Sequence, residues 1–112
     1  MNIALDYDGT FSAEKSGWLE FIDSFTMRGH KIYIVTYRNE IDKNEEFDQL
    51  YWWKDVSTIY TDGKAKRQFV RELGIEIDIW IDDRPETILE DSKITPEEYQ
   101  VWREEIRKNE RV

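Results

Sequence analysis

Apolar residues follow two different spacings along this chain. Runs of β-branched and aromatic residues predict buried strands at residues 2–6, 31–37 and 56–61, and alternating apolar and acidic residues predict a fourth strand at 75–81. Elsewhere apolar side chains recur every three or four positions, as on one face of a helix. That spacing predicts a helix through Trp18, Phe21, Ile22 and Phe25 that stops at Gly29, a short helix around residues 47–51, and helices at 65–73 and 96–109.

Strands that alternate with helices are typical of α/β folds, in which right-handed crossovers produce a mainly parallel sheet. We therefore expect a Rossmann-like three-layer sandwich with helices on both faces of the sheet. The 112 residues suffice for one hydrophobic core but not for a second, so a single domain over residues 1–112 is expected. Such sheets place their functional residues at the carboxyl ends of the strands.

Charge and composition narrow the choice of partners. A formal net charge of −9 argues against strong nucleic-acid binding and against an anionic membrane surface, because both depend on lysine and arginine. The absence of cysteine excludes disulfides and thiolate metal sites. The amino terminus does not resemble a signal segment, and no apolar run is long enough to span a bilayer, so a cytoplasmic protein is expected.

The first predicted strand ends in two acids, Asp6 and Asp8, followed at once by Gly9. Because side chains on a strand alternate with a period of two, both carboxylates can face the same side where the strand leaves the core. Two acids this close repel each other unless a cation joins them. A hard divalent cation with oxygen ligands is the natural partner, and a carboxylate beside it can attack phosphorus.

Polar residues also follow the other predicted strands. Thr36 ends the second strand, a lysine at position 64 or 66 lies at the start of the helix that precedes the fourth strand, and Asp82 and Asp83 follow the fourth strand. The carboxyl ends of parallel strands meet at one edge of the sheet, so these residues should converge there with Asp6.

This ordered set resembles the haloacid dehalogenase superfamily of phosphotransferases over roughly residues 1–90. That family has an Asp-x-Asp-Gly-Thr-like first strand end, here Asp6 to Thr10, then a Thr or Ser, a Lys and a final acidic pair. The resemblance implies that Asp6 is a nucleophile that forms an aspartyl-phosphate. It implies that Asp8 is the general acid that protonates the leaving oxygen and then activates water.

The resemblance also implies a magnesium site. Mg²⁺ would be held by Asp6, by the backbone carbonyl of Asp8 and by Asp82, while Asp83 would bind through water or support the other ligands. Thr36 would hydrogen-bond a phosphoryl oxygen. The remaining candidates for substrate binding are Gly9, Thr10, Tyr37, Arg38 and Lys64.

Two lysines compete for the role of neutralising the nucleophile and the phosphate. Lys66 lies on the same helical stripe as Phe69, Val70 and Leu73, which places it on the side that faces the core, whereas Lys64 lies off that stripe. Lys66 is favoured, and Lys64 remains open.

One other family gathers acids, a Thr or Ser and a Lys around magnesium, the response-regulator receivers. There the acidic pair comes first along the chain and the lysine last, so the order in this chain disfavours that interpretation. His30 is expected to be a loop residue without a catalytic role. The aromatic cluster Tyr51-Trp52-Trp53 fits either an edge of the core or a surface that stacks on a base or docks a partner.

Most members of the superfamily insert a cap domain after the first or third strand. The corresponding gaps here are short, so no cap domain is expected, and specificity would come from a large substrate, loop residues or a neighbour in a homo-oligomer. The function expected from the resemblance is a magnesium-dependent phosphomonoester hydrolase, with nucleotides or phosphorylated nucleic-acid ends as the preferred substrates. The alternative is a catalytically weak binding or regulatory protein that acts through a partner.

Overall fold

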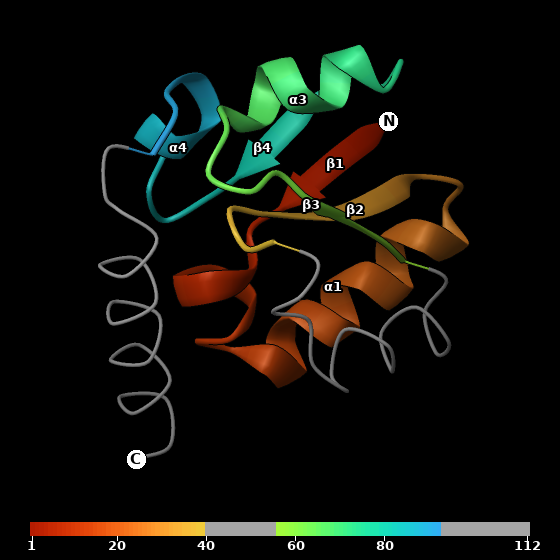
Figure 1. Ribbon diagram of the computed structural model, residues 1–112. Helices are drawn as coiled ribbons and strands as arrows, with labels where there is room; N and C mark the ends of the chain where they lie inside the picture. Colours follow the sequence, from red (N-terminus) through yellow and green to blue (C-terminus); the bar gives the residue numbers. More distant parts are fainter. Residues whose placement is uncertain (40–55, 93–112) are drawn as a thin grey trace.

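The computed structural model of this protein describes residues 1–39 and 56–92. Within these ranges it contains a four-stranded, all-parallel sheet with strand order β3-β2-β1-β4 (Figure 1). The strands are β1 (Asn2–Leu5), β2 (Lys31–Thr36), β3 (Ser57–Tyr60) and β4 (Ile79–Ile81). The α/β class and the parallel sheet are therefore confirmed. The helices predicted at 47–51 and 96–109 and the aromatic cluster at 51–53 lie outside the described residues.

The helices are η1 (Tyr7–Phe11), α1 (Lys15–Met27), α3 (Lys66–Glu72) and α4 (Glu86–Leu89). Of these, η1 is a tight turn rather than a continuous helix, because Asp8 and Gly9 have non-helical backbone angles. In the described part of the chain, no helix combines the length and the apolar character needed to cross a membrane.

The fourth strand is shorter than the alternating pattern predicted. Residues 75–81 were expected to be extended, but only Ile79–Ile81 pair, and their partners are the residues of β1. Because β1 begins at Asn2, pairing with it can start only near Asp78, whose carboxylate accepts the Asn2 backbone N–H at 2.7 Å. Ile75 and Ile77 instead pack against the core from the connection that precedes the strand.

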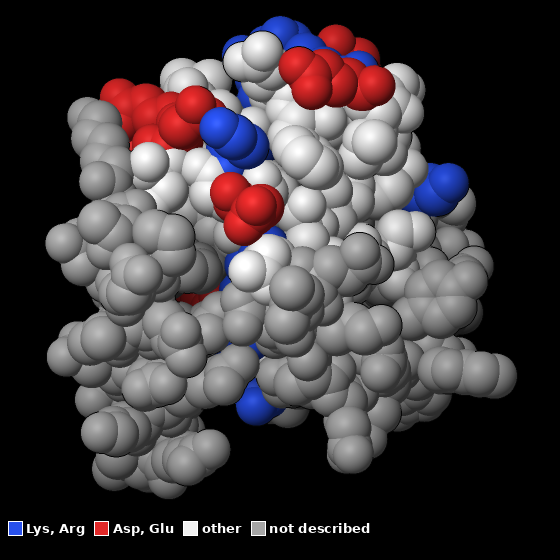
Figure 2. All heavy atoms as spheres, viewed as in Figure 1, with Lys and Arg blue, Asp and Glu red and all other residues white. Residues whose placement is uncertain are grey.

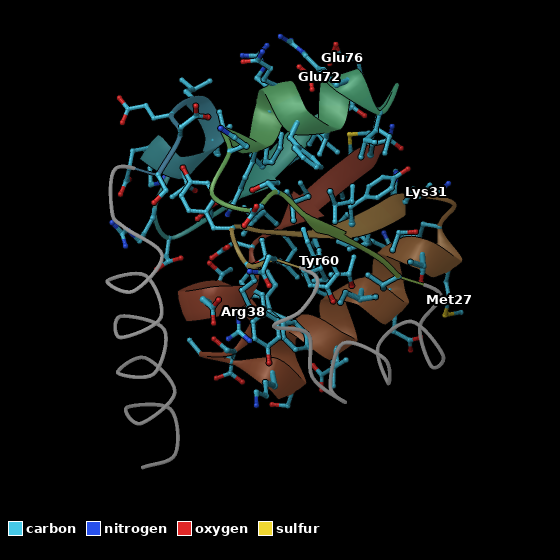
Figure 3. The ribbon with its side chains drawn as sticks, viewed as in Figure 1. Met27, Lys31, Arg38, Tyr60, Glu72 and Glu76 are labelled. Carbon is cyan, nitrogen blue, oxygen red and sulfur yellow. The ribbon has the colours of Figure 1, made fainter. Side chains whose placement is uncertain are left out.

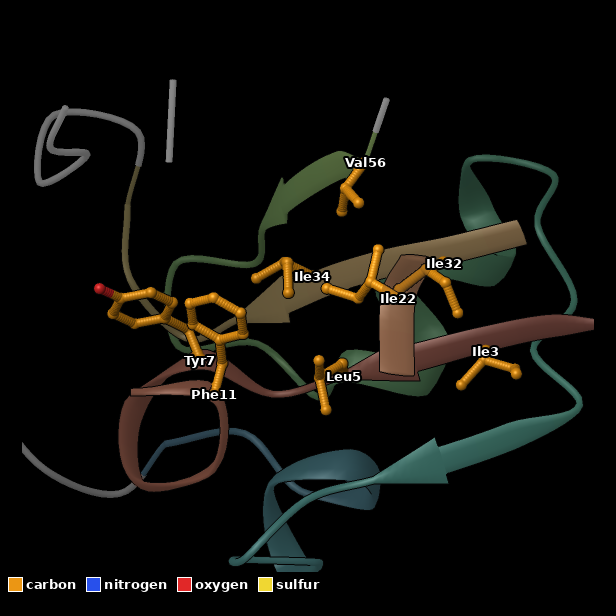
Figure 4. Packing of buried hydrophobic residues seen from close by; sticks show 8 residues of the cluster. All are labelled: Ile3, Leu5, Tyr7, Phe11, Ile22, Ile32, Ile34 and Val56. Atoms are coloured by element: carbon orange, nitrogen blue, oxygen red, sulfur yellow. The ribbon is translucent and has the colours of Figure 1, made fainter. Parts of the chain in front are cut away.

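Alternation along β1 and β2 divides the core into two clusters. Figure 4 shows the first, in which Ile22 of α1 meets apolar side chains from the strands and from η1. Its buried members are Ile3, Leu5, Tyr7, Phe11, Ile22, Ile32, Ile34 and Val56. Full burial of each aliphatic side chain contributes roughly 1.5–3 kcal/mol.

The second cluster lies on the opposite face of the sheet. It contains Ala4, Tyr33, Val35, Ile59 and Val70, of which Val70 belongs to α3. Trp80 is partly buried and packs against it. Neighbouring strand residues alternate between the two clusters, so α1 and α3 cover opposite faces (Figure 1).

The strand order determines where a site can form. The chain proceeds outward from β1 to β2 and β3, then returns to place β4 on the other side of β1. A crevice is expected at the carboxyl ends of β1 and β4, where the order reverses. Asp6 lies directly after β1, and Asp82 directly after β4.

Candidate active site

Three carboxylates gather at the carboxyl ends of β1 and β4. The backbone N–H of Asp6 donates to the Ile81 carbonyl at 3.0 Å, which extends the strand pairing by one residue and fixes both acidic segments together. One carboxylate oxygen from each of Asp6, Asp82 and Asp83 lies within 4.8 Å of the other two. Asp6 is 8% exposed, so this member of the cluster is buried.

Lys66 joins the two more buried acids. It is the first residue of α3, its side chain is 2% exposed, and its Nζ lies 2.8 Å from Asp6 Oδ1 and 2.6 Å from Asp82 Oδ2. Phe69 and Val70 pack against the core, and Lys66 lies on the same side of α3, as the spacing of residues 66, 69 and 70 predicted. Leu73 was predicted on this stripe too, but it follows the last residue of α3 and is 57% exposed. Lys64 is exposed, so the structure brings Lys66, rather than Lys64, to the acids.

Burial and charge compete at this cluster. Burial raises the pKa of Asp6 well above its ordinary value, the Lys66 ammonium lowers it, and the charge of Asp82 raises it again. Burial by itself lowers the pKa of Lys66, but the charges of Asp6 and Asp82 outweigh that effect and raise it. An ionised Asp6 is therefore costly here, and any further cation at the cluster favours its charged form.

The turn η1 brings a hydroxyl between the acids. The Thr10 side-chain oxygen lies 3.2 Å from Asp6 Oδ2 and 3.0 Å from Asp83 Oδ1, and it accepts the Asp83 backbone N–H at 3.1 Å. With one proton, it donates to one carboxylate at a time. Thr10 was predicted to bind substrate, but the structure places it as a link between the ends of β1 and β4.

Gly9 makes this turn possible. Its φ is +88°, a conformation that side chains with a Cβ rarely adopt. A Cβ built at this position would lie 2.3 Å from Asp83 Oδ2, so any other residue here would require the Asp83 side chain to move. Gly9, predicted as a substrate contact, therefore has a clear structural role beside the acidic cluster.

The Asp8 carboxylate lies apart from the other three. Arg38 binds both of its oxygens, through Nε to Oδ2 at 2.7 Å and through a second nitrogen to Oδ1, and both side chains are almost completely buried. The guanidinium also lies 5.0 Å from the centre of the Tyr7 ring, beside η1 (Figure 3). Arg38 was predicted to touch substrate; in the structure its side chain is 1% exposed and its guanidinium binds Asp8.

A pocket opens to solvent beside these acids, and the space not filled by atoms amounts to about 240 Å³, adjoining solvent included. Four of its lining residues were expected catalytic groups, and Tyr37 was an expected substrate contact. The lining consists of Asp6, Asp8, Thr36, Tyr37, Lys66, Asp82, Arg84 and Thr87. Thr10, Arg38 and Lys64 are not among them.

Sequence reasoning missed Arg84 and Thr87. Thr87 donates its hydroxyl to Asp82 Oδ2 at 3.0 Å, which helps to orient that carboxylate. Arg84 follows the acidic pair directly, and this adjacency was the one signal that could have identified it. Nothing in the spacing of Thr87 marked it, because the short helix α4 that carries it has no clear apolar period.

Tyr37 lies between the pocket and the end of the described chain. Its ring centre is 5.5 Å from Lys66 Nζ, and its hydroxyl donates to the Glu90 carbonyl. Burial, followed by the negative charges of Asp91, Asp82, Glu86 and Glu90, raises the pKa of Tyr37 to about 12. The phenol therefore stays protonated at neutral pH and can act as a hydrogen-bond donor.

His30 lies at the opposite edge of the sheet. It precedes β2, its Nδ1 is 2.9 Å from the amino group of Met1, and its ring lies 5.5 Å from that of Phe25. This position is consistent with the expectation that His30 has no catalytic role.

The donor set fits magnesium. Carboxylate oxygens are the ligands that Mg²⁺ prefers, and Asp6, Asp82 and Asp83 supply them from two adjacent strand ends. Lys66 contacts only one oxygen of Asp6 and one of Asp82. The second oxygen of each carboxylate, together with Asp83, can therefore serve a cation while Lys66 stays in place.

Comparison of the chain with protein-family models, with curated protein sequences and with solved structures gave no match. The case for a function therefore rests on the geometry of this site.

Proposed function

We propose that this chain is a magnesium-dependent phosphomonoester hydrolase that acts through an aspartyl-phosphate on Asp6. In this proposal it is a small, capless member of the haloacid dehalogenase superfamily, with one domain built as a Rossmann-like three-layer sandwich. The observation that carries the proposal is the contact of Lys66 Nζ with Asp6 Oδ1 at 2.8 Å, within a cluster completed by Asp82 and Asp83. A buried carboxylate with a cation on one oxygen and acids beside it is suited to phosphoryl transfer.

Asp6 provides the nucleophile. One of its carboxylate oxygens attacks phosphorus, the bond from phosphorus to the ester oxygen breaks, and water later cleaves the acyl phosphate to release inorganic phosphate. Lys66 and the Thr36 hydroxyl, which both line the pocket, can hold phosphoryl oxygens during both steps. Bound at Asp6, Asp82 and Asp83, Mg²⁺ would supply positive charge that offsets the negative charge of the phosphoryl oxygens.

Asp8 provides proton transfer in this proposal, because it lines the same pocket as Asp6. It would give a proton to the leaving oxygen and take one from the attacking water. Both of its oxygens accept hydrogen bonds from Arg38 in the described state.

The connections that follow β1 and β3 are short, which supports a form without a cap domain. Only residues 6–14 connect β1 to α1, and only residues 61–65 connect β3 to α3, too few for an inserted domain.

The proposed substrates are nucleotides and phosphorylated nucleic-acid ends. On the face seen in Figure 2, basic and acidic side chains lie side by side over α3 and α4, an arrangement that offers little grip on a long polyanion.

The test is phosphate release from a panel of phosphomonoesters, including nucleotides and 3′- and 5′-phosphorylated oligonucleotides, with Mg²⁺ and with a chelator. We expect release that requires Mg²⁺ and that falls on the order of 10³-fold or more in Asp6→Asn. The matched control is Asp23→Asn, which removes an exposed carboxylate from α1. Circular dichroism and thermal unfolding establish that each variant folds.

Turnover that survives Asp6→Asn in a folded protein would rule out the aspartyl-phosphate mechanism. An absence of release across the whole panel would instead favour a binding or regulatory protein that acts through a partner.

A further inference from the structure

Two cations line the pocket, and they differ in burial. Lys66 is 2% exposed and contacts Asp6 and Asp82, so its charge is used inside the site. The Arg84 side chain is 46% exposed and lies at the mouth of the same pocket. Arg84 is therefore the lining cation that a solute approaching from water meets first.

The main chain of Arg84 is held firmly. Its backbone N–H donates to Asp82 Oδ1 at 3.0 Å, and its carbonyl accepts the Thr87 N–H at 3.0 Å. The Thr87 hydroxyl also lies 2.8 Å from this carbonyl, and its one proton serves either the carbonyl or Asp82 Oδ2 at a time. The base of the side chain is thus fixed relative to a carboxylate of the acidic cluster. Any group that the guanidinium binds is placed at a defined position next to the pocket.

The guanidinium of Arg84 forms an ion pair at the surface. Its Nε lies 3.1 Å from Glu86 Oε1, and the Glu86 side chain is 51% exposed. An exposed ion pair of this kind contributes at most about 1 kcal/mol. An anionic group of a ligand can therefore compete with Glu86 for the Arg84 guanidinium, because breaking this exposed pair costs little.

Acidic side chains surround the pocket, so an anionic ligand needs positive charge from Arg84 to offset their repulsion. Asp6, Asp8, Asp82 and Asp83 lie around the site, whereas the buried cations Lys66 and Arg38 are already paired with these acids. A dianionic ligand that enters this environment gains from positive charge at the mouth. The flat guanidinium matches the oxygens of phosphate and of carboxylate, to which it can donate two hydrogen bonds.

We propose that Arg84 binds a second anionic group of the substrate, a phosphate or a carboxylate, while the phosphate to be hydrolysed enters the pocket. This inference rests on the proposed function and narrows its substrate class to phosphomonoesters that carry another negative group a few bonds away. Arg84 acts as a specificity-determining residue, and Glu86 competes with the substrate for it.

Binding of three stable phosphonates tests the proposal without any turnover. Propylphosphonate has one anionic group, 3-phosphonopropionate adds a carboxylate, and propane-1,3-bisphosphonate adds a second phosphonate. Affinities are measured by calorimetry in the presence of Mg²⁺. We expect the two ligands with a second anion to bind roughly tenfold more tightly than propylphosphonate, and their difference separates carboxylate from phosphate as the preferred group.

The variants Arg84→Gln and Glu86→Gln should change these affinities in opposite directions. Arg84→Gln removes most of the preference for a second anion and leaves propylphosphonate binding within about twofold, whereas Glu86→Gln strengthens binding of both two-anion ligands about two- to fivefold. The matched control is Arg71→Gln, since Arg71 forms a similar exposed pair with Glu76 at 3.2 Å and has the same 46% exposure, but lies outside this pocket.

Equal affinities of the native protein for all three phosphonates, or an equal loss for all three in Arg84→Gln, would overturn this role of Arg84. A preference for the second anion in a protein that hydrolyses no phosphomonoester would keep Arg84 as a binding residue and refute the enzyme. Hydrolysis of phosphomonoesters without a preference for a second anion would support the enzyme and refute this role of Arg84.

Discussion

At the scale of single residues, Gly9 shows how closely the turn after β1 approaches the acids. Two separate features exclude a side chain there, the φ of +88° and the approach of Asp83 Oδ2 to 2.3 Å from where a Cβ would lie. Gly29 has the same φ, but nothing lies within 4 Å of its Cβ position. A comparison of the two glycines therefore distinguishes the cost of the positive φ from the cost of the close approach of Asp83.

We expect Gly29→Ala to lower the free energy of unfolding by about 1–2 kcal/mol, the cost of a left-handed conformation. Gly9→Ala should cost at least about 1 kcal/mol more, because Asp83 must also move. It should weaken Mg²⁺ binding as well, whereas Gly29→Ala should not. Urea unfolding and calorimetric titration with Mg²⁺ measure the two effects. Equal losses of stability in both variants would show that Asp83 moves aside without cost.

Residues that contact each other across the sheet were the hardest to assign. Asp8 and Arg38 both belonged to the expected site, yet their ion pair was not foreseen, because they lie 30 positions apart. The motif after β1 identified Asp8 as a functional acid. Only the packing of η1 against the end of β2 could show which cation lies beside it.

At the scale of elements, the start of α3 decides where Lys66 lies. Ala65 precedes this helix and has no hydroxyl or carboxylate with which to cap it. The Ala65 backbone N–H instead donates to Asp91 Oδ1 at 2.8 Å, and the Ser92 N–H donates to the Gly63 carbonyl at 2.6 Å. The segment after α4 thus holds the loop that leads into α3.

Removal of this distant acceptor should loosen the helix start. We expect Asp91→Ala to lower the free energy of unfolding by about 0.5–2 kcal/mol, the usual cost of losing a side-chain acceptor at a helix start. Asp91→Asn keeps an acceptor oxygen and should retain most of the stability. Urea unfolding of the two variants provides the measurement. An equal loss in both would assign the effect to the charge of Asp91 rather than to its hydrogen bond.

At the scale of the whole molecule, stability is linked to the charge of the Asp6, Lys66 and Asp82 cluster. The pKa of Lys66 is raised, so its contribution is complete below the ordinary value of 10.5 and is lost as pH rises through the folded value. The pKa of Asp6 is also raised, with burial as the main cause, so unfolding becomes easier as pH rises from 3.8 through the folded value. The Lys66 ammonium lowers the pKa of Asp6 and thereby reduces the stability that is lost when Asp6 ionises.

Lys66→Met should therefore be most harmful near neutral pH. It leaves Asp6 and Asp82 without their shared cation, and we expect a loss of about 3–5 kcal/mol at pH 7. The loss should be smaller at about pH 4, where Asp6 holds a proton because its pKa is raised, and Mg²⁺ should restore part of the stability. Urea unfolding between these pH values, with and without Mg²⁺, tests this expectation.

The control is Arg71→Met, which breaks an exposed ion pair and should cost at most about 1 kcal/mol at any of these pH values. A loss in Lys66→Met that does not depend on pH would mean that packing of the lysine stem, rather than its charge, stabilises the fold.

The sequence by itself determined the local choices. Its periodicity predicted the α/β class and the parallel sheet, because a buried strand and an amphipathic helix differ in spacing wherever they occur. It also predicted that acids and a lysine would meet at one edge, and the stripe through Phe69 and Val70 selected Lys66. Each of these predictions depends on neighbours along the chain and on one general property of parallel sheets.

The tertiary structure alone decided the pairings between distant segments. The length of β4 depends on where β1 begins, the partner of Asp8 is set by the end of β2, and the exposure of Arg84 depends on how the chain turns after β4. The two carboxylate contacts of Thr10 likewise depend on the pairing of β1 with β4. Such contacts join residues far apart in sequence, and local spacing carries no record of which of them will meet.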